Sequence, residues 1–345
     1  MCESESFAVV RLGLIGCGTV GTAFVEALRV RRLAIAERYG VWLDVVEAAV
    51  AHPARARPEL DGMRVHGNGA QLAANPALDL IIEASTARDA GAWMRVALAR
   101  GAAVVSANKA AIAADPVLLE ELVAPVSWLW CEAAVGGAVP IVRGLRESLA
   151  GIGVQSIRGV LNGTTTYVLS RMEAHGSFGE AVRAAQAAGY AEADPTADLS
   201  GADAAAKLAI LATVAWGTPI SVDRVSACGI DTSTLGALAG ALGNAWQTGA
   251  RIRLVATATR LEPAGVVRAL VAPTVLPAGD ALHATVGVEN VIEIESELAG
   301  TLSWRGAGAG GAATASALLA DAVAAARARI RVGWIRSNSV EYGHR

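Results

Sequence analysis

The chain has 345 residues, of which 53% are hydrophobic, 18% are charged and 4% are aromatic, and its formal net charge at pH 7 is −3. This length predicts two domains, and the hydrophobic content excludes a disordered protein. The small negative charge gives no electrostatic reason to expect nucleic acid as a partner.

The cysteines and the N-terminus indicate the compartment. The four cysteines (Cys2, Cys17, Cys131 and Cys228) are scattered without a C-x-x-C pair, which predicts free thiols in a reducing compartment. Residues 1–6 are acidic where a signal peptide would be basic, and no apolar run reaches the length of a membrane span. We therefore expect a soluble cytoplasmic protein without a membrane partner.

The first chemical motif follows a Val-, Leu- and Ile-rich strand predicted over residues 7–15. Residues 16–21 read Gly-Cys-Gly-Thr-Val-Gly, and a helical pattern follows over residues 22–32. In G-x-G-x-x-G, the three glycines allow a tight turn, the approach of a pyrophosphate and close packing of helix on strand. The helix N-terminus offers N–H groups to the phosphates. The alternative is a glycine-rich turn in another α/β protein. The candidate cofactor-binding residues here are Gly16, Gly18, Thr19, Val20 and Gly21.

The end of the second predicted strand, residues 43–50, bears on the choice of cofactor. NAD enzymes commonly place an acidic residue there to bind the ribose 2′-hydroxyl. Residues 51–57 read Ala-His-Pro-Ala-Arg-Ala-Arg instead. Without an acid and with Arg55 and Arg57 close by, NADP is predicted over NAD, although solvated loop charges explain both arginines equally well.

Three more strands complete the predicted nucleotide-binding domain, at residues 80–83, 102–106 and 127–130, with helices over residues 89–100 and 116–123. Ligands of open α/β sheets bind beyond the carboxyl ends of the strands. Thr86 follows one of these ends, and Asn108 and Lys109 follow another. Thr86 and Lys109 are therefore candidates for cofactor contacts, with a plain surface lysine as the alternative for Lys109.

Residues 131–140 read Cys-Glu-Ala-Ala-Val-Gly-Gly-Ala-Val-Pro. Paired glycines after a strand expose backbone carbonyl groups, and hard monovalent cations bind such oxygens together with a carboxylate. This loop permits a cation site, and a structural hinge is the default alternative.

A second group of polar residues follows a helix predicted over residues 141–150 and a strand over residues 154–161. Residues 162–167 read Asn-Gly-Thr-Thr-Thr-Tyr, which suits a small polar ligand or a cap for the next helix. A short helix over residues 178–188 then leads to the most charged stretch of the chain.

Residues 189–207 form this charged stretch. Proline, serine and glycine predict a non-helical first half, and a helix is predicted from residue 202. Asp203 and Lys207 then fall on one face of that helix. The alternative interpretation is a solvated loop with a surface salt bridge. The charged residues of the stretch are Glu192, Asp194, Asp198, Asp203 and Lys207.

The remaining elements predict a second sheet and a return to the first domain. Strands over residues 252–259, 266–271, 291–296 and 302–304 imply an antiparallel or mixed sheet. A glycine-rich loop that includes Gly310 then precedes a long helix that ends near residue 330. This loop either closes over the cofactor, with Gly310 as a candidate cofactor contact, or simply returns the chain to the first domain. We expect a Rossmann-type nucleotide-binding domain (residues 1–133, completed by about 307–345) and an α+β catalytic and dimerisation domain with a mixed sheet (residues 134–306).

Taken together, the motifs resemble those of homoserine dehydrogenases. The matching segments are residues 16–21, 107–109, 132–137, 161–165, 189–207 and 308–316, in the family's order and over most of the chain. Residues 189–207 are the most specific of them. The resemblance implies reversible NAD(P)-dependent interconversion of L-homoserine and L-aspartate 4-semialdehyde, in the biosynthesis of threonine, methionine and isoleucine, by a homodimer.

The resemblance also implies residue roles. Lys207 is the implied proton donor and acceptor with Asp203 beside it, and Lys109 is implied near nicotinamide and substrate. The implied substrate-binding residues are Glu192, Asp198, Tyr190 and Thr164. Sodium or potassium would bind the backbone oxygens of Val135, Gly137 and Val139, supported by Glu132.

The sequence departs from the family pattern at several positions. Thr166 stands in place of a usual Asn, Ala138 in place of Gly, and Ala307 and Ala313 in place of prolines. The chain ends soon after its last helix, so we expect a short form without a C-terminal ACT domain and without threonine feedback through one.

Two other functions remain as alternatives. One is another Rossmann dehydrogenase of a small amino or hydroxy acid, and the other is a non-catalytic NADP-binding sensor. The carboxylates with Lys207 argue against a substrate that lacks an amino group. The presence of both Asp203 and Lys207 argues against the sensor.

Overall fold

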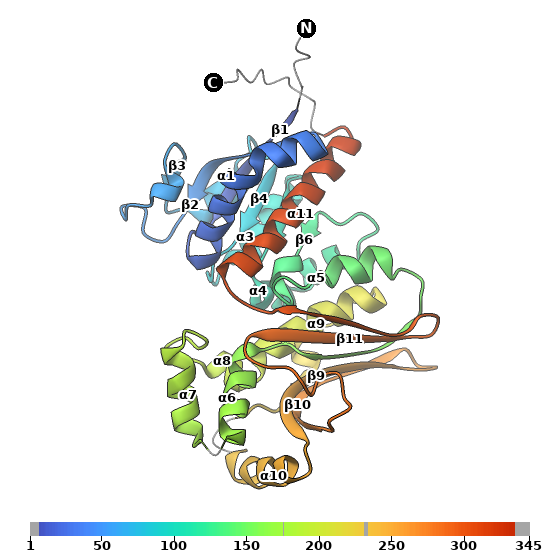
Figure 1. Cartoon of the computed structure of the whole chain (residues 1–345). Coiled ribbons are helices and arrows are strands. Elements are labelled where there is room, and N and C mark those ends of the chain that lie inside the picture. Colours follow the sequence, from blue (N-terminus) through green and yellow to red (C-terminus); the bar gives the residue numbers. More distant parts are fainter. Residues whose placement is uncertain (1–6, 175, 231–233, 335–345) are drawn as a thin grey trace. The chain divides into compact units, whose positions relative to one another are not determined.

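The computed structural model describes residues 7–174, 176–230 and 234–334. The chain divides into two compact units (Figure 1). The first unit comprises Met1–Ala111, Ala124–Ala134 and Gly310–Arg345, and the second comprises Ile112–Val123 and Val135–Ala309. None of the helices in the described residues combines the length and apolarity that a membrane crossing requires.

The first unit is built on a parallel sheet of six strands in the order β3-β2-β1-β4-β5-β6. The order reverses direction between β1 and β4, and open α/β sheets bind ligands at such a point, beyond the carboxyl ends of the strands. This sheet confirms the predicted Rossmann-type fold. Its strands are β1 (Ala8–Ile15), β2 (Val41–Ala49), β3 (Arg64–His66), β4 (Leu80–Glu83), β5 (Ala103–Ser106) and β6 (Leu129–Trp130).

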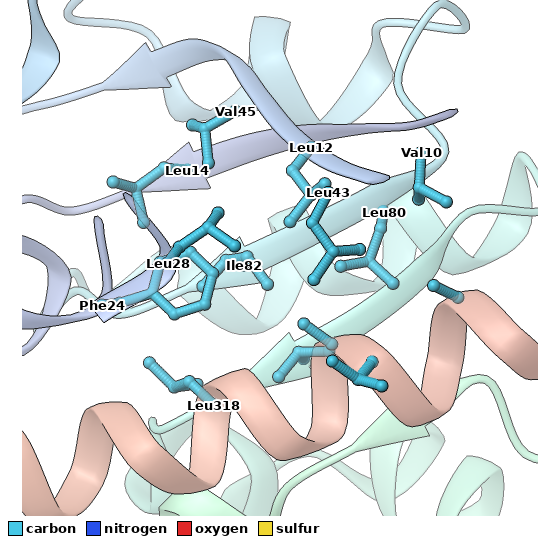
Figure 2. Packing of buried hydrophobic residues seen from close by; sticks show 14 of the residues in the cluster. Val10, Leu12, Leu14, Phe24, Leu28, Leu43, Val45, Leu80, Ile82 and Leu318 are labelled. Carbon is cyan, nitrogen blue, oxygen red and sulfur yellow. The ribbon is translucent and has the colours of Figure 1, made fainter. Parts of the chain in front are cut away.

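Two long helices, α1 (Thr19–Tyr39) and α11 (Gly311–Arg331), pack side by side against this sheet (Figure 1). In Figure 2, Phe24 and Leu28 of α1 and Leu318 of α11 lie against strand side chains such as Leu14 and Leu43. The labelled side chains are all buried. Burial of each Leu or Phe contributes roughly 1.5–3 kcal/mol, so this core fixes the start of α1 at the end of β1. The shorter helices are α2 (Gly69–Ala74), α3 (Ala90–Ala99) and α4 (Lys109–Ala114).

The second unit contains a mixed sheet in the order β12-β11-β7-β9-β10-β8, antiparallel except where β8 pairs with β10. Helix α9 (Ala202–Trp216) packs against four strands of this sheet, β7, β8, β9 and β10. The strands are β7 (Val154–Val160), β8 (Val225–Ala227), β9 (Arg251–Leu261), β10 (Val266–Leu276), β11 (Glu289–Ser296) and β12 (Gly300–Ala307). The other helices are α5 (Pro116–Val123), α6 (Gly163–Glu173), α7 (Phe178–Ala187), α8 (Thr196–Leu199) and α10 (Leu235–Gln247).

Two helical segments of the second unit differ in type from the sequence prediction. A single helical turn, α8, lies in the stretch expected to be non-helical, because the carboxylate of Asp194 accepts hydrogen bonds from the backbone N–H and hydroxyl of Thr196 and starts the turn. Gly201, with φ of 84°, ends it before α9 begins. The helix expected over residues 141–150 is a π-helical turn over Gly144–Ser148, extended by a hydrogen bond from Leu149 N–H to the Gly144 carbonyl at 2.9 Å.

Candidate active site

The glycine loop of the first unit leaves open space in front of α1. A Cβ atom on Gly16, which has φ of 89°, would lie 2.7 Å from the carbonyl oxygen of Ala84, and a Cβ on Gly21 would lie 2.2 Å from that of Gly16. A Cβ on Gly18 would meet nothing within 4 Å. The first and third glycines are therefore required by packing, whereas the second keeps a surface open for a ligand.

The N-terminus of α1 is suited to a pyrophosphate. Gly18 is the N-cap residue, makes no side-chain cap hydrogen bond, and is followed by a first turn without an acidic residue. The backbone N–H groups of Thr19 and Val20 point out of this turn, at the positive end of the helix dipole. These residues fit the phosphates of a dinucleotide.

A buried acid that the sequence analysis did not select joins the ends of β4 and β5. The carboxylate of Glu83 accepts hydrogen bonds from Ser85 N–H and Oγ, at 2.9 and 2.6 Å, and from Ser106 Oγ at 2.9 Å. Burial raises the pKa of Glu83, and the hydrogen bonds from Ser85 and Ser106 oppose that shift. The sequence feature that could have identified Glu83 is an acidic residue at the end of an otherwise apolar strand.

The same network positions the start of α4. The side chain of Asn108 donates to the Ser85 carbonyl oxygen at 3.1 Å and accepts from Ala111 N–H at 3.0 Å. Lys109, the first residue of α4, is half-buried, and Thr86 is exposed in the loop after β4. Both selected residues thus lie at the carboxyl edge of the parallel sheet.

The loop after β2 contains both arginines that were selected for NADP and an acid that was not. Arg55 is exposed, and the guanidinium of Arg57 donates to the carbonyl oxygens of His52 and Arg55 at 2.8 and 3.1 Å. A 3₁₀ turn over Pro58–Leu60 then brings Glu59 to the start of α1. Residues 51–57 contain no acid, as the sequence analysis states, but the fold brings the carboxylate of Glu59, two residues further along the chain, to the glycine loop.

The loop selected for a cation has the expected irregular backbone. Gly136 and Gly137 have φ values of 76° and 60°. The carbonyl oxygen of Val139 accepts from Ile141 N–H at 2.9 Å. Val135 and Val139 are buried in the second unit, and Glu132 is buried in the first. Among the described residues no three His, Cys, Asp or Glu side chains are grouped to hold a metal ion, so a cation here would depend on backbone oxygens.

The charged pair on α9 is buried. Nζ of Lys207 lies 2.7 Å from Oδ2 of Asp203 and donates to the carbonyl oxygen of Leu161 at 2.6 Å. Only 8% of Lys207 and 9% of Asp203 is exposed, which excludes the solvated surface salt bridge. A buried lysine whose ammonium group has two fixed acceptors retains a third N–H for a further oxygen atom.

Asn162, which the sequence analysis placed in a polar cluster but did not select as a site residue, connects this pair to the preceding loop. Its Nδ2 donates to Asp198 Oδ1 at 2.7 Å and to Asp203 Oδ2 at 2.9 Å. Its Oδ1 accepts from Thr165 N–H at 2.9 Å and caps α6. The one amide thus orients two carboxylates. Its place at the head of a polar cluster after a strand is a signal that could have identified it.

The other selected residues of this segment differ in their contacts and in their exposure to solvent. The Thr164 hydroxyl lies 2.8 Å from Asp198 Oδ2 and 2.6 Å from the Tyr190 carbonyl oxygen. Tyr190 is 40% exposed, and Glu192 is exposed on the same segment. Thr166 donates to the Asn162 carbonyl oxygen at 2.9 Å, so the departure from the family pattern is accommodated within α6.

Comparison with known proteins identifies the family. Residues 140–323 match the model of the homoserine dehydrogenase family, and residues 16–127 match that of the homoserine dehydrogenase NAD-binding domain.

The chain belongs to the homoserine dehydrogenase family.

Similar proteins agree with this membership. The chain is 37% identical over 307 residues to a homoserine dehydrogenase of Corynebacterium glutamicum, which covers 87% of this chain and 68% of the relative. It is 42% identical over 217 residues to that of Mycobacterium tuberculosis, covering 61% of this chain and 48% of the relative. The chain therefore spans about half to two thirds of these relatives.

Solved structures of the family share the fold. A homoserine dehydrogenase from Thiobacillus denitrificans superposes with a TM-score of 0.86 at 33% identity, over 95% of this chain and 75% of that one. A hyperthermophilic archaeal homoserine dehydrogenase in complex with NADPH superposes with a TM-score of 0.75 at 26% identity, over 92% and 98%. As a member of this family, the chain is an oxidoreductase with a nicotinamide cofactor. The comparisons favour neither another Rossmann dehydrogenase nor a non-catalytic NADP-binding sensor.

Proposed function

We propose that the chain reduces L-aspartate 4-semialdehyde to L-homoserine, reversibly, with NADPH or NADH. The observation that supports this proposal is the buried Lys207–Asp203 pair, linked through Asn162 to Asp198. An ammonium group for a developing alkoxide and carboxylates for a substrate ammonium are thereby combined in one network. A substrate with both an aldehyde and an α-amino group uses both parts.

Lys207 is the proposed proton donor. Addition of a hydride to the aldehyde carbon builds negative charge on the aldehyde oxygen, and a positioned ammonium group stabilises and protonates that oxygen. Asp203 and the Leu161 carbonyl oxygen hold the Lys207 ammonium in one orientation. In the reverse direction, Lys207 accepts the proton of the homoserine hydroxyl.

The amino end of the substrate is proposed to bind the carboxylates of the preceding segment. Asp198 is oriented by Asn162 and Thr164, and Glu192 is exposed to receive a ligand. Tyr190 and Thr164 complete this group. A primary ammonium forms charge-assisted hydrogen bonds with such carboxylates.

The nicotinamide cofactor supplies the hydride when it is bound. The proposed holding residues are Gly16, Gly18, Thr19, Val20 and Gly21 for the pyrophosphate, and Thr86, Lys109 and Gly310 elsewhere. NADP is proposed as the preferred form because exposed Arg55 can pair with a 2′-phosphate. Lys109 is the proposed second catalytic lysine.

Three further features belong to the proposal. Val135, Gly137 and Val139, with Glu132, would bind sodium or potassium through oxygen atoms. Residues 1–133 with 307–345 would form the dinucleotide-binding domain, and residues 134–306 the substrate and dimerisation domain. The active form would be a homodimer.

Two glycine variants test the proposed pyrophosphate site. Gly18→Ala is expected to leave the unfolding temperature nearly unchanged, because its Cβ meets nothing within 4 Å, and to weaken NADPH binding by about tenfold, because that Cβ occupies the approach to α1. Gly21→Ala is the contrast, since a Cβ 2.2 Å from the Gly16 carbonyl oxygen forces a shift that costs about 1–3 kcal/mol. Thermal unfolding and NADPH fluorescence separate the two effects, and unimpaired NADPH binding by Gly18→Ala would move the cofactor away from this loop.

The function itself is tested by following oxidation of NADPH and NADH at 340 nm with L-aspartate 4-semialdehyde, in sodium and in potassium buffer. Turnover that depends on the semialdehyde and yields homoserine is the expected result. A purified, folded protein that oxidises neither cofactor in either buffer would refute the proposal.

A further inference from the structure

Glu59 lies at the glycine loop although it is far from that loop in sequence. Its Oε1 accepts a hydrogen bond from Thr22 Oγ1 at 3.1 Å, across a separation of 37 residues, and another from Cys17 Sγ at 3.6 Å. The Arg29 guanidinium donates to the Glu59 backbone carbonyl at 2.7 Å. Side chain and backbone are therefore both held against the first turns of α1.

This carboxyl group is ionised at neutral pH. Its own backbone N–H lowers the pKa of Glu59, and hydrogen bonds from Thr22 and Cys17 and the positive charge of Arg57 lower it further. The neighbouring Cys17 thiol has its pKa raised, mainly by burial, with the Glu59 charge adding to the shift. Glu59 thus presents a fixed negative charge beside the glycine loop.

An anion beside the adenosine ribose of a bound dinucleotide discriminates between NAD(H) and NADP(H). In Rossmann dehydrogenases the ribose of the adenosine half lies beside the glycine loop, and an acid there accepts a hydrogen bond from the 2′-hydroxyl. The same acid repels a 2′-phosphate, since like charges a few ångströms apart disfavour binding. Hydrogen bonds from Cys17 in the glycine loop and from Thr22 in α1 hold the Glu59 carboxylate beside this loop. Gly18 leaves the position of the pyrophosphate open.

We propose that Glu59 is a specificity-determining residue of the cofactor site, which binds the ribose 2′-hydroxyl of NAD(H) and opposes the 2′-phosphate of NADP(H). The inference rests on the nicotinamide cofactor of the proposed function. Arg55 and Glu59 lie in the same loop with opposite charges, so they act on the 2′-position in opposite directions. The chain consequently uses NADH as well as NADPH, and Glu59 limits its preference for NADPH.

The test compares Glu59→Gln with the wild type in binding and in turnover. Dissociation constants for NADH and NADPH are measured by cofactor fluorescence, and kcat/KM is measured for each cofactor with L-aspartate 4-semialdehyde. Glu59→Gln is expected to raise the NADPH-to-NADH selectivity ratio by about tenfold or more, through weaker NADH binding and tighter NADPH binding. Arg55→Gln is expected to lower the same ratio.

Two variants control for other causes. Glu37→Gln makes the same charge change on the exposed surface of α1 and is expected to leave the ratio unchanged. Glu59→Asp keeps the charge and is expected to keep the discrimination against NADPH, even if Glu59→Gln folds poorly. An equal effect of Glu59→Gln on both cofactors, or an equal shift in Glu37→Gln, would overturn the inference.

The binding measurement separates this inference from the proposed reaction. A changed ratio of dissociation constants in a protein that does not reduce the semialdehyde would refute the reaction and support the role of Glu59. Normal turnover of the semialdehyde with an unchanged ratio of dissociation constants would support the reaction and refute the role of Glu59.

Discussion

Substitution of Lys207 by methionine is expected to lower kcat by about 10³-fold, with NADPH binding retained. Methionine keeps the length and apolar stem of the side chain but removes the ammonium that lies 2.7 Å from Asp203 and 2.6 Å from the Leu161 carbonyl oxygen. The aldehyde oxygen then lacks its proton donor. Single-turnover and steady-state oxidation of NADPH measure the loss, and NADPH fluorescence measures binding.

The control for this variant must address stability, because Asp203 is left in a buried site without its cation. An uncompensated buried charge costs up to about 3–5 kcal/mol, although Asn162 still donates to Asp203 at 2.9 Å. The double variant Lys207→Met/Asp203→Asn removes both charges and is expected to regain stability without activity. Near-normal turnover of either variant would move the acid–base role to Lys109.

The largest loss of stability is expected from Glu173→Gln. Arg253 is fully buried on β9, and its NH1 lies 2.8 Å from the Glu173 carboxylate. Burial lowers the pKa of Arg253, and the charge of Glu173 acts in the opposite direction. Without that charge the guanidinium is buried and unneutralised, so the free energy of unfolding is expected to fall by about 3–5 kcal/mol.

Urea denaturation of matched variants measures this effect. The double variant Glu173→Leu/Arg253→Met replaces the pair by apolar side chains and is expected to recover most of the loss. Glu289→Gln breaks an exposed pair with Arg305 on the same sheet and is expected to cost less than about 1 kcal/mol. If Glu173→Gln were no more destabilising than Glu289→Gln, the buried pair would contribute little to stability.

The sequence was sufficient to predict those structural features that depend on residues close to one another in the chain. The glycine loop, the apolar strand at Leu80–Glu83 and the helix that places Asp203 and Lys207 on one face depend on residues within a few positions of one another. Short elements such as α2 and α8 were missed because a few residues carry too little periodicity, and their stability comes from tertiary contacts.

Long-range pairings explain the rest. Glu59 lies 37 residues from Thr22, and Glu173 lies 80 residues from Arg253. No spacing rule links such positions, because the folded sheets and the 3₁₀ turn bring them together. Asn162 is intermediate, since its capping role is local but its contacts to Asp198 and Asp203 depend on the packing of α6, α8 and α9.

The complete burial of α9 from Asp203 to Thr213 has a consequence for how substrate range can change. Ala204, Ala205 and Ala206 directly precede the lysine, and a larger side chain at any of them would displace the helix by overpacking. By contrast, the exposed segment that carries Tyr190 and Glu192 tolerates new side chains. Laboratory evolution toward other amino aldehydes is therefore expected to accumulate substitutions in that segment and to leave the buried residues of α9 unchanged.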